Sequence, residues 1–203
     1  MTIPRWAPAL AIPLAAAIGP QATLADGAAT APGRAVVVLA GGCYWGVESV
    51  FRHVRGVESV ASGYATPAPP ATASAGPAEA VRVTYDPARV SFRQILAVFF
   101  LVAHDPTQLN RQGPDVGPEY RSIAFAAGDR ERRVVRAYMD SLTAARAFAR
   151  PIVTQLATLR SFQPADDSQQ DYAARHPTDP YIVINDIPKL DTLRRRFPRL
   201  YRN

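Results

Sequence analysis

The sequence predicts a compact single domain of the α/β (α+β) class, with a mixed sheet and a split βαβ, ferredoxin-like core. Two observations lead to this prediction. Short β-branched runs alternate with helical patterns, in the order strand–helix–strand, strand–helix–strand and then helix. The 203 residues are 48% hydrophobic and 20% charged, a globular composition that excludes disordered and collagen-like chains. Residues 35–203 show no internal repeat and no linker, so we expect them to form one domain.

The first half of this domain is expected to hold three strands and a helix. Residues 35–40 form a continuous β-branched run, typical of a strand buried on both faces. A helix that ends at Gly56 should follow, because apolar residues recur at helical spacing: Val47, Val50, Phe51 and Val54. Residues 57–64 and 81–85 are expected strands, and the Pro- and Ala-rich residues 65–77 between them are an expected exposed loop.

The second half is expected to alternate helices and strands around one long loop. Ser91 is a suitable N-cap for a helix with a buried aromatic and aliphatic side. Prolines and glycines in residues 104–119 predict a loop of defined shape. A strand over 120–125, a helix over about 129–149 and a strand over 151–159 should follow, with one or two short helices in the tail.

The first 25 residues have the pattern of a secretory signal peptide. Arg5 precedes an apolar run at 7–18 that is too short to span a bilayer, and small residues at 22–25 offer a cleavage site. Residues 26–34 are then a flexible segment, and the mature protein is exported to the periplasm, with no membrane segment. The alternative is a disordered arm on a cytoplasmic protein.

Composition also limits the kinds of site and partner. A single cysteine excludes an internal disulfide framework and any multi-cysteine metal site. The three histidines are scattered without ligand-like spacing, so we expect no metal site. The net charge is +6, but the arginines are spread along the chain, which disfavours nucleic-acid binding. We expect a monomer.

Cys43 is the candidate reactive residue. It follows a buried strand and Gly41-Gly42 and opens a helix, where the helix dipole and unpaired backbone N–H groups stabilise a thiolate. The thiolate is the nucleophilic form of cysteine. Tyr44 and Trp45 place two aromatic surfaces beside the sulfur, and the glycines let the backbone approach a bound molecule. The alternative is a buried structural cysteine.

A nucleophilic thiol needs a partner that handles protons. His53, His104 or His176 could serve only if the fold brought one of them to Cys43. Glu79 precedes the apolar residues of an expected strand, and a carboxyl group that is partly buried there has a raised pKa and can donate a proton. The alternative for Glu79 is a solvated residue at the end of a strand.

These residues and the 104–121 loop resemble the family of type A peptide-methionine (S)-S-oxide reductases. The resemblance covers roughly residues 35–175 in the family's order. The matching blocks are residues 41–48, 56–57, 62–64, 78–83, 85–87, 104–108, 110–113, 115–117 and 120–122. It implies an oxidoreductase that repairs oxidative damage, with residues 35–203 as its catalytic domain.

The resemblance also implies a role for each site residue. Cys43 attacks the sulfoxide sulfur and becomes a sulfenic acid, while Glu79 protonates the sulfoxide oxygen. Tyr120 donates a hydrogen bond to that oxygen, and Asp115 orders the surrounding network. The residues expected to line the substrate site are Tyr44, Trp45 and Gly42.

Regeneration of the cysteine is expected to depend on an external thiol. Many relatives carry resolving cysteines in the tail, whereas this chain has only Cys43. The expected reductant is a thioredoxin- or glutaredoxin-like protein, or dithiothreitol in vitro, with no bound cofactor. The expected substrate is methionine-S-sulfoxide, either free or in proteins.

The chain departs from the family's pattern in two places: the 65–77 loop lacks the family's second tyrosine, and Tyr44 stands where phenylalanine is usual. The alternative is therefore a low-activity or repurposed thiol enzyme or binding protein on the same scaffold.

Overall fold

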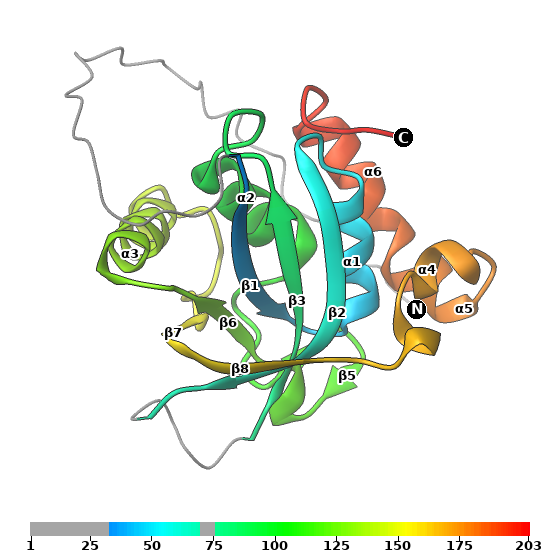
Figure 1. Ribbon diagram of the computed structural model, residues 1–203, viewed down its shortest axis with the longest axis horizontal. Coiled ribbons are helices and arrows are strands. Elements are labelled where there is room, and N and C mark those ends of the chain that lie inside the picture. Colours follow the sequence, from blue (N-terminus) through cyan, green and yellow to red (C-terminus); the bar gives the residue numbers. More distant parts are fainter. Residues whose placement is uncertain (1–32, 70–75) are drawn as a thin grey trace.

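The computed structural model describes residues 33–69 and 76–203 (Figure 1). The expected signal peptide, nearly all of the 26–34 segment and the middle of the 65–77 loop lie outside these residues. The strands are β1 (Ala35–Gly41), β2 (Val57–Pro67), β3 (Ala78–Tyr85), β4 (Arg111–Gln112), β5 (Asp115–Val116), β6 (Ser122–Phe125), β7 (Gln155–Ala157) and β8 (Leu159–Pro164). The α-helices are α1 (Tyr44–Arg52), α2 (Phe92–Val98), α3 (Asp129–Ala144), α4 (Tyr172–Arg175), α5 (Pro180–Asn185) and α6 (Ile187–Arg196). In this described part, no helix combines the length and the apolar character that crossing a membrane requires.

The main sheet confirms the predicted split βαβ arrangement. Its strand order is β7-β6-β1-β3-β2-β8. Because β1 and β2 are each antiparallel to β3 between them, they run parallel to one another and are joined by α1. β7 pairs with β6 in parallel, so the sheet is mixed as expected. The short strands β4 and β5 form a separate hairpin within the 104–119 loop.

The two faces of β1 belong to two parts of the core. Val37 and Leu39 pack with α1, α2, α3 and α6, which is the larger cluster. The alternate residues of β1, Val38 and Ala40, face a smaller cluster that includes Phe125 and is covered by Leu159 and Phe162 of β8. Figure 1 shows α1 and α2 behind the sheet, α6 next to α1, and β8 crossing the lower end of β2. Burial on both faces explains the unbroken apolar run of β1.

Several expected elements have different limits in the structure. Pro118 starts a 3₁₀ turn, η2 (Pro118–Tyr120), so Tyr120 precedes β6 rather than opening it. α3 ends at Ala144 because Arg146, just after the C-cap, has a left-handed backbone (φ +49°). Of the strand expected over 151–159, only β7 forms a strand within that range. β8 begins at the last residue of that range and was missed, because its largely polar residues, half-exposed or exposed, lie on the edge of the sheet. The tail holds three helices, not one or two.

Candidate active site

Cys43 lies at the junction of β1 and α1, as the sequence predicts. It is the N-cap residue of α1 and is partly exposed. Gly42, just before it, has a φ of +89°, a conformation that only glycine adopts easily. A Cβ on Gly42 would lie 2.4 Å from Gln112 Cβ. Glycine is therefore required here for a second reason, since the backbone is in close contact with the 104–119 loop. This contact brings that loop against the thiol.

The 104–119 loop is held in shape by its own polar side chains. Gln112 Oε1 accepts a hydrogen bond from Asp105 N (3.1 Å), and Gln112 Nε2 donates one to Asp105 O (3.1 Å). The Asp105 carboxylate accepts bonds from Thr107 N (2.9 Å) and Thr107 Oγ1 (2.7 Å), and from Gln108 Nε2 (3.0 Å). The motif at 104–113 therefore builds a rigid support for β5, which carries Asp115.

Glu79 lies beside the nucleophile on the neighbouring part of the sheet. It is the second residue of β3, and its Oε2 accepts a hydrogen bond from Tyr44 N at 3.0 Å, one residue after Cys43. Burial raises the pKa of Glu79 to about 7, and the negative charges of Asp115 and Glu119 act in the same direction, against the hydrogen bond from Tyr44. A carboxyl group with this pKa is available as an acid near neutral pH.

The Cys43 thiol does not have the lowered pKa that its place at a helix N-terminus suggests. Burial raises the pKa of Cys43 to about 12, and the charges of Glu79 and Asp186 add to this effect. The Trp45 backbone N–H and the Tyr181 hydroxyl act in the opposite direction but do not balance it. The structure therefore does not favour the expected resting thiolate, because burial and the nearby carboxylates outweigh the stabilising effect of the helix N-terminus.

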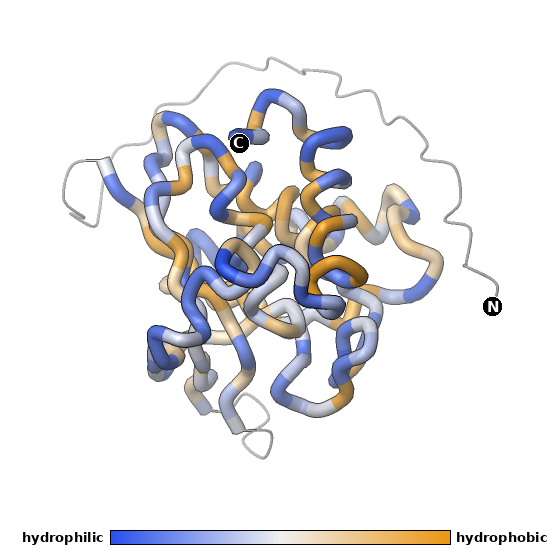
Figure 2. The backbone as a smooth tube through the Cα atoms, turned by 90° about the vertical axis from the view of Figure 1, so that its right-hand side faces the viewer, coloured by the Kyte–Doolittle hydropathy of each residue, from blue (hydrophilic) through white to orange (hydrophobic). Residues whose placement is uncertain are grey.

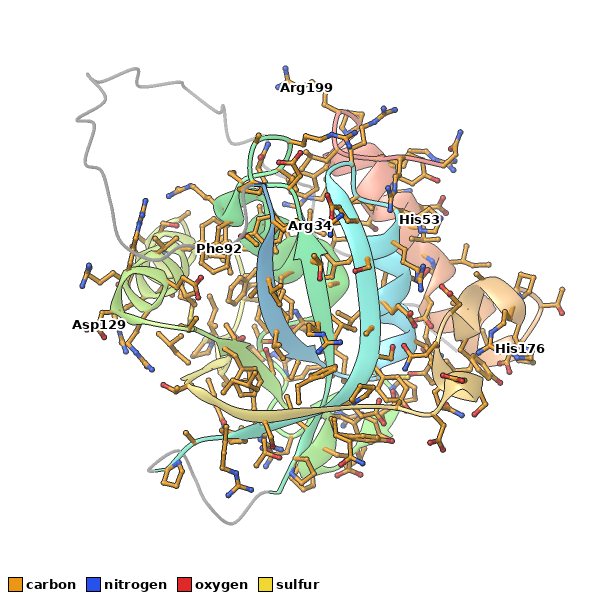
Figure 3. The ribbon with its side chains drawn as sticks, in the orientation of Figure 1. Arg34, His53, Phe92, Asp129, His176 and Arg199 are labelled. Atoms are coloured by element: carbon orange, nitrogen blue, oxygen red, sulfur yellow. The ribbon has the colours of Figure 1, made fainter. Side chains whose placement is uncertain are left out.

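The histidines have partners elsewhere. His104 is buried, with Nδ1 2.9 Å from Phe99 O and Nε2 2.7 Å from Ser122 Oγ, and burial lowers its pKa to about 4. His53 Nδ1 lies 2.7 Å from a carbonyl oxygen of α1. Figure 3 shows His53 near the end of α1 and His176 beside α4 at the outer edge of the molecule. Glu79, rather than a histidine, is thus the titratable group that the fold places beside Cys43.

Tyr44 and Trp45 form an aromatic wall next to the thiol. The Tyr44 hydroxyl lies 3.4 Å from that of Tyr64, and its ring is buried. The Trp45 indole stacks on Tyr172, with ring centroids 3.8 Å apart, and meets the edge of Tyr181 at 5.8 Å. An apolar surface held rigidly on both sides suits a methyl group of a bound thioether.

Tyr181 is a site residue that sequence reasoning missed. Its hydroxyl donates a hydrogen bond of 2.5 Å to Asp115 Oδ2 and also lies within hydrogen-bonding reach of the Cys43 thiol. Tyr120 lies nearby: burial raises its pKa to about 12, and the charges of Glu79, Asp115 and Cys43 contribute. The fold therefore brings together all seven residues singled out from the sequence. No local pattern pointed to Tyr181, because it lies in the tail, far along the chain from Cys43.

Two features of the described residues bear on where a ligand could bind: their metal-binding side chains and a cavity beside α1. Among them, no group of three or more histidine, cysteine or acidic side chains could hold a metal ion. A cavity of about 240 Å³ lies between α1 and the α4–α6 region and includes Trp45 in its lining, but not Cys43 or Glu79. Figure 2 faces the side of the molecule that carries α4, α5 and α6, where hydrophobic stretches lie among hydrophilic ones. We assign the chemistry to the Cys43 region, because its reactive groups converge there.

Comparisons with known proteins point to one family. Residues 35–200 match the family model described as peptide methionine sulfoxide reductase. A protein of Mesorhizobium japonicum named peptide methionine sulfoxide reductase MsrA 2 is 46% identical over 178 residues, which is 84% of this chain and 91% of that relative.

Solved structures of two relatives have a similar fold. Methionine sulfoxide reductase A of Corynebacterium diphtheriae is 33% identical with a TM-score of 0.58, over 72% of this chain and 76% of that one. Reduced Mxr1 from Saccharomyces cerevisiae is 26% identical with a TM-score of 0.65, over 73% and 89% of the two chains. A cysteine, a carboxylic acid and an aromatic wall on this fold, together with these matches, lead to one conclusion: the chain belongs to the peptide methionine sulfoxide reductase family and is an oxidoreductase that reduces methionine sulfoxide.

Proposed function

We propose that the enzyme reduces the S epimer of methionine sulfoxide, with Cys43 as nucleophile and Glu79 as the acid. The observation that carries this proposal is the hydrogen bond from Tyr44 N to Glu79 Oε2, because it holds the carboxyl group beside the sulfur. A neutral sulfoxide becomes electrophilic only when its oxygen is protonated or strongly hydrogen-bonded. Below about pH 7, Glu79 carries the proton that this step needs.

The raised pKa values of both groups fit a concerted step. The buried site disfavours net charge, so its resting form below about pH 7 has a neutral Cys43 thiol and a protonated Glu79. As the sulfur attacks, Glu79 gives its proton to the sulfoxide oxygen and the thiol proton returns to the carboxylate. A bond forms between the Cys43 sulfur and the methionine sulfur, the S–O bond breaks, and Glu79 passes on its proton so that the oxygen leaves as water. Water then attacks the Cys43 sulfur and returns a proton to Glu79, the S–S bond breaks with its electron pair on the methionine sulfur, and Cys43 is left as a sulfenic acid.

The remaining residues orient the substrate. Tyr120 donates a hydrogen bond to the sulfoxide oxygen, and Asp115 fixes the hydroxyl of Tyr181, which also interacts with the Cys43 thiol. Tyr44 and Trp45 receive the methyl group, and Gly42 lets the backbone approach the substrate. A sulfur held by an acid, hydrogen-bond donors and an aromatic wall can be recognised as a single epimer.

The sulfenic acid is reduced by two equivalents of an external thiol, which leave as a disulfide together with water. Support for a thioredoxin-like reductant comes from a relative, since yeast Mxr1 has been solved in complex with Trx2.

The pattern of residues 1–25 supports export of the protein to the periplasm. Mass spectrometry of the mature N-terminus, in protein from periplasmic material, tests this proposal. An N-terminus at Met1 in cytoplasmic material would reject export.

The test of the activity is incubation of the protein with each sulfoxide epimer and dithiothreitol, followed by quantification of methionine. Release from the S epimer alone is expected. Cys43→Ser should abolish it, and Glu58→Gln, which removes an exposed carboxylate paired with Arg34, should leave it unchanged. Release by Cys43→Ser would overturn the mechanism, and no release from either epimer by the intact protein would favour a repurposed scaffold.

A further inference from the structure

A charge pair with a buried carboxylate lies against the helical turn that follows Cys43. Asp186 is 2% exposed, and its Oδ1 forms an ion pair with Lys189 Nζ at 3.0 Å. A Cβ on Gly46 would lie 2.0 Å from Asp186 Oδ1 and 2.5 Å from Lys189 Nζ. The pair therefore packs directly on the first turn of α1, three residues after the nucleophile, at a position where only glycine leaves room for it.

The cation of this pair is singular in the sequence. Lys189 is the only lysine in a chain with 23 lysines and arginines. The ammonium group of lysine is a compact point charge, whereas the guanidinium group of arginine is wider and planar and needs more room against the backbone. All the other 22 residues in this count are arginines, and the single lysine stands where a cation packs against Gly46.

The charges around the thiol are otherwise negative. Cys43 is faced by Glu79 from β3, by Tyr181 from α5 and by Asp186 from the start of α6. Asp186 is also within reach of the charge of Asp115. Asp186 Oδ2 is buried and has no hydrogen-bond partner within the described part of the chain.

Lys189 offsets part of this negative charge. Burial raises the pKa of Asp186, and Lys189 acts against that rise. The charge of Lys189 also reaches His104, on which it acts together with burial to lower the pKa. Removing either member of the pair changes the electrostatic potential at the thiol, and the two changes have opposite signs.

We propose that Asp186 and Lys189 are positioning residues of the active site, whose two opposite charges support the first turn of α1 and set how readily the Cys43 thiol ionises. The inference rests on Cys43 being the nucleophile. It predicts that neutralising Lys189 makes the thiol less reactive, that neutralising Asp186 makes it more reactive, and that removing both charges restores the original reactivity.

The test measures alkylation of Cys43, the only thiol, by uncharged iodoacetamide at about pH 8, with mass spectrometry as readout. Below the thiol pKa the rate follows the fraction of thiolate, which changes tenfold for each pKa unit. Lys189→Met should slow alkylation at least about threefold, and Asp186→Asn should accelerate it at least about threefold. The double variant should fall within about twofold of the wild type.

The control is Arg34→Met, which removes the cation of another ion pair, just before the start of β1 and at its far end from Cys43. Its alkylation rate should be unchanged. Circular dichroism establishes that each variant is folded. If Asp186→Asn does not fold, Lys189→Met can be compared with the double variant instead. These two proteins also differ only by the negative charge of Asp186, so the double variant should be alkylated faster than Lys189→Met.

Shifts in the same direction, or no shift, in the two single variants would overturn the proposal, because a purely structural pair has no reason to move the rate in opposite directions. The outcome is separate from that of the sulfoxide assay, since alkylation involves no sulfoxide. Absence of reductase activity with opposite shifts in alkylation would refute the proposed function and leave the role of the charge pair intact.

Discussion

Replacing Glu79 with glutamine should stabilise the fold at alkaline pH while removing most of the reductase activity. Burial raises the pKa of Glu79 from 4.5 to about 7. The difference corresponds to about 3 kcal/mol between the folded and unfolded states. Because the side chain is partly exposed, solvent screening reduces this cost of ionising it in the fold to about 1–2 kcal/mol. Glutamine avoids the cost, and its amide oxygen can still accept the hydrogen bond from Tyr44 N.

The sign of this effect follows from the direction of the shift. The pKa of Glu79 is higher in the folded state than in the unfolded state. Its contribution to the free energy of unfolding is therefore fully present below pH 4.5 and is lost as the pH rises through about 7. The free energy of unfolding of Glu79→Gln minus that of the wild type should therefore increase by about 1–2 kcal/mol between about pH 5 and pH 8. Urea unfolding at both pH values measures it.

The same variant should lose about a hundredfold or more in rate at about pH 6, where the wild-type acid is protonated. Glu58→Gln is the matched control, expected to change neither quantity. A stability difference that does not vary with pH would show that the Glu79 carboxyl is well solvated. Activity within about threefold of the wild type would show that Glu79 is not the proton donor.

Three further outcomes are expected. Tyr181→Phe removes the hydrogen bond to Asp115 and should lower kcat/KM about tenfold or more in the sulfoxide assay; an unchanged value would contradict a role in the site. Gly42→Ala forces a Cβ to 2.4 Å from Gln112 Cβ and should reduce both activity and thermal stability, whereas a wild-type Tm would contradict the close contact. His104→Ala should lower the free energy of unfolding by about 2–4 kcal/mol at neutral pH. In the wild type, the lowered pKa of His104 predicts a loss of stability as the pH falls from 6.5 to about 4, which this variant should not show.

Much of the fold was predictable because its signals are local. The doubly buried β1 and the capping box at Ser91 each depend on residues close together in the sequence. The limits of other elements depend on distant contacts. β8 is a strand because β2 offers it an edge to pair with, and a half-exposed strand with Arg160 and Gln163 has no apolar pattern that marks it. In the tail, α4 and α6 likewise gain their place by packing against α1, and α5 packs on α6.

By itself, the sequence predicted which groups carry the chemistry: it holds one thiol, Gly-Gly before a helix marks its place, and the position of Glu79 at the start of a strand made it the candidate acid. Only the tertiary structure decided the ionisation of that thiol and its further neighbours. The physical reason is that a pKa depends on burial and on every charge nearby. β3, α5 and the start of α6 bring Glu79, Tyr181 and Asp186 to Cys43 from distant parts of the chain. Their combined effect on the pKa of Cys43 cannot be predicted from any local sequence pattern.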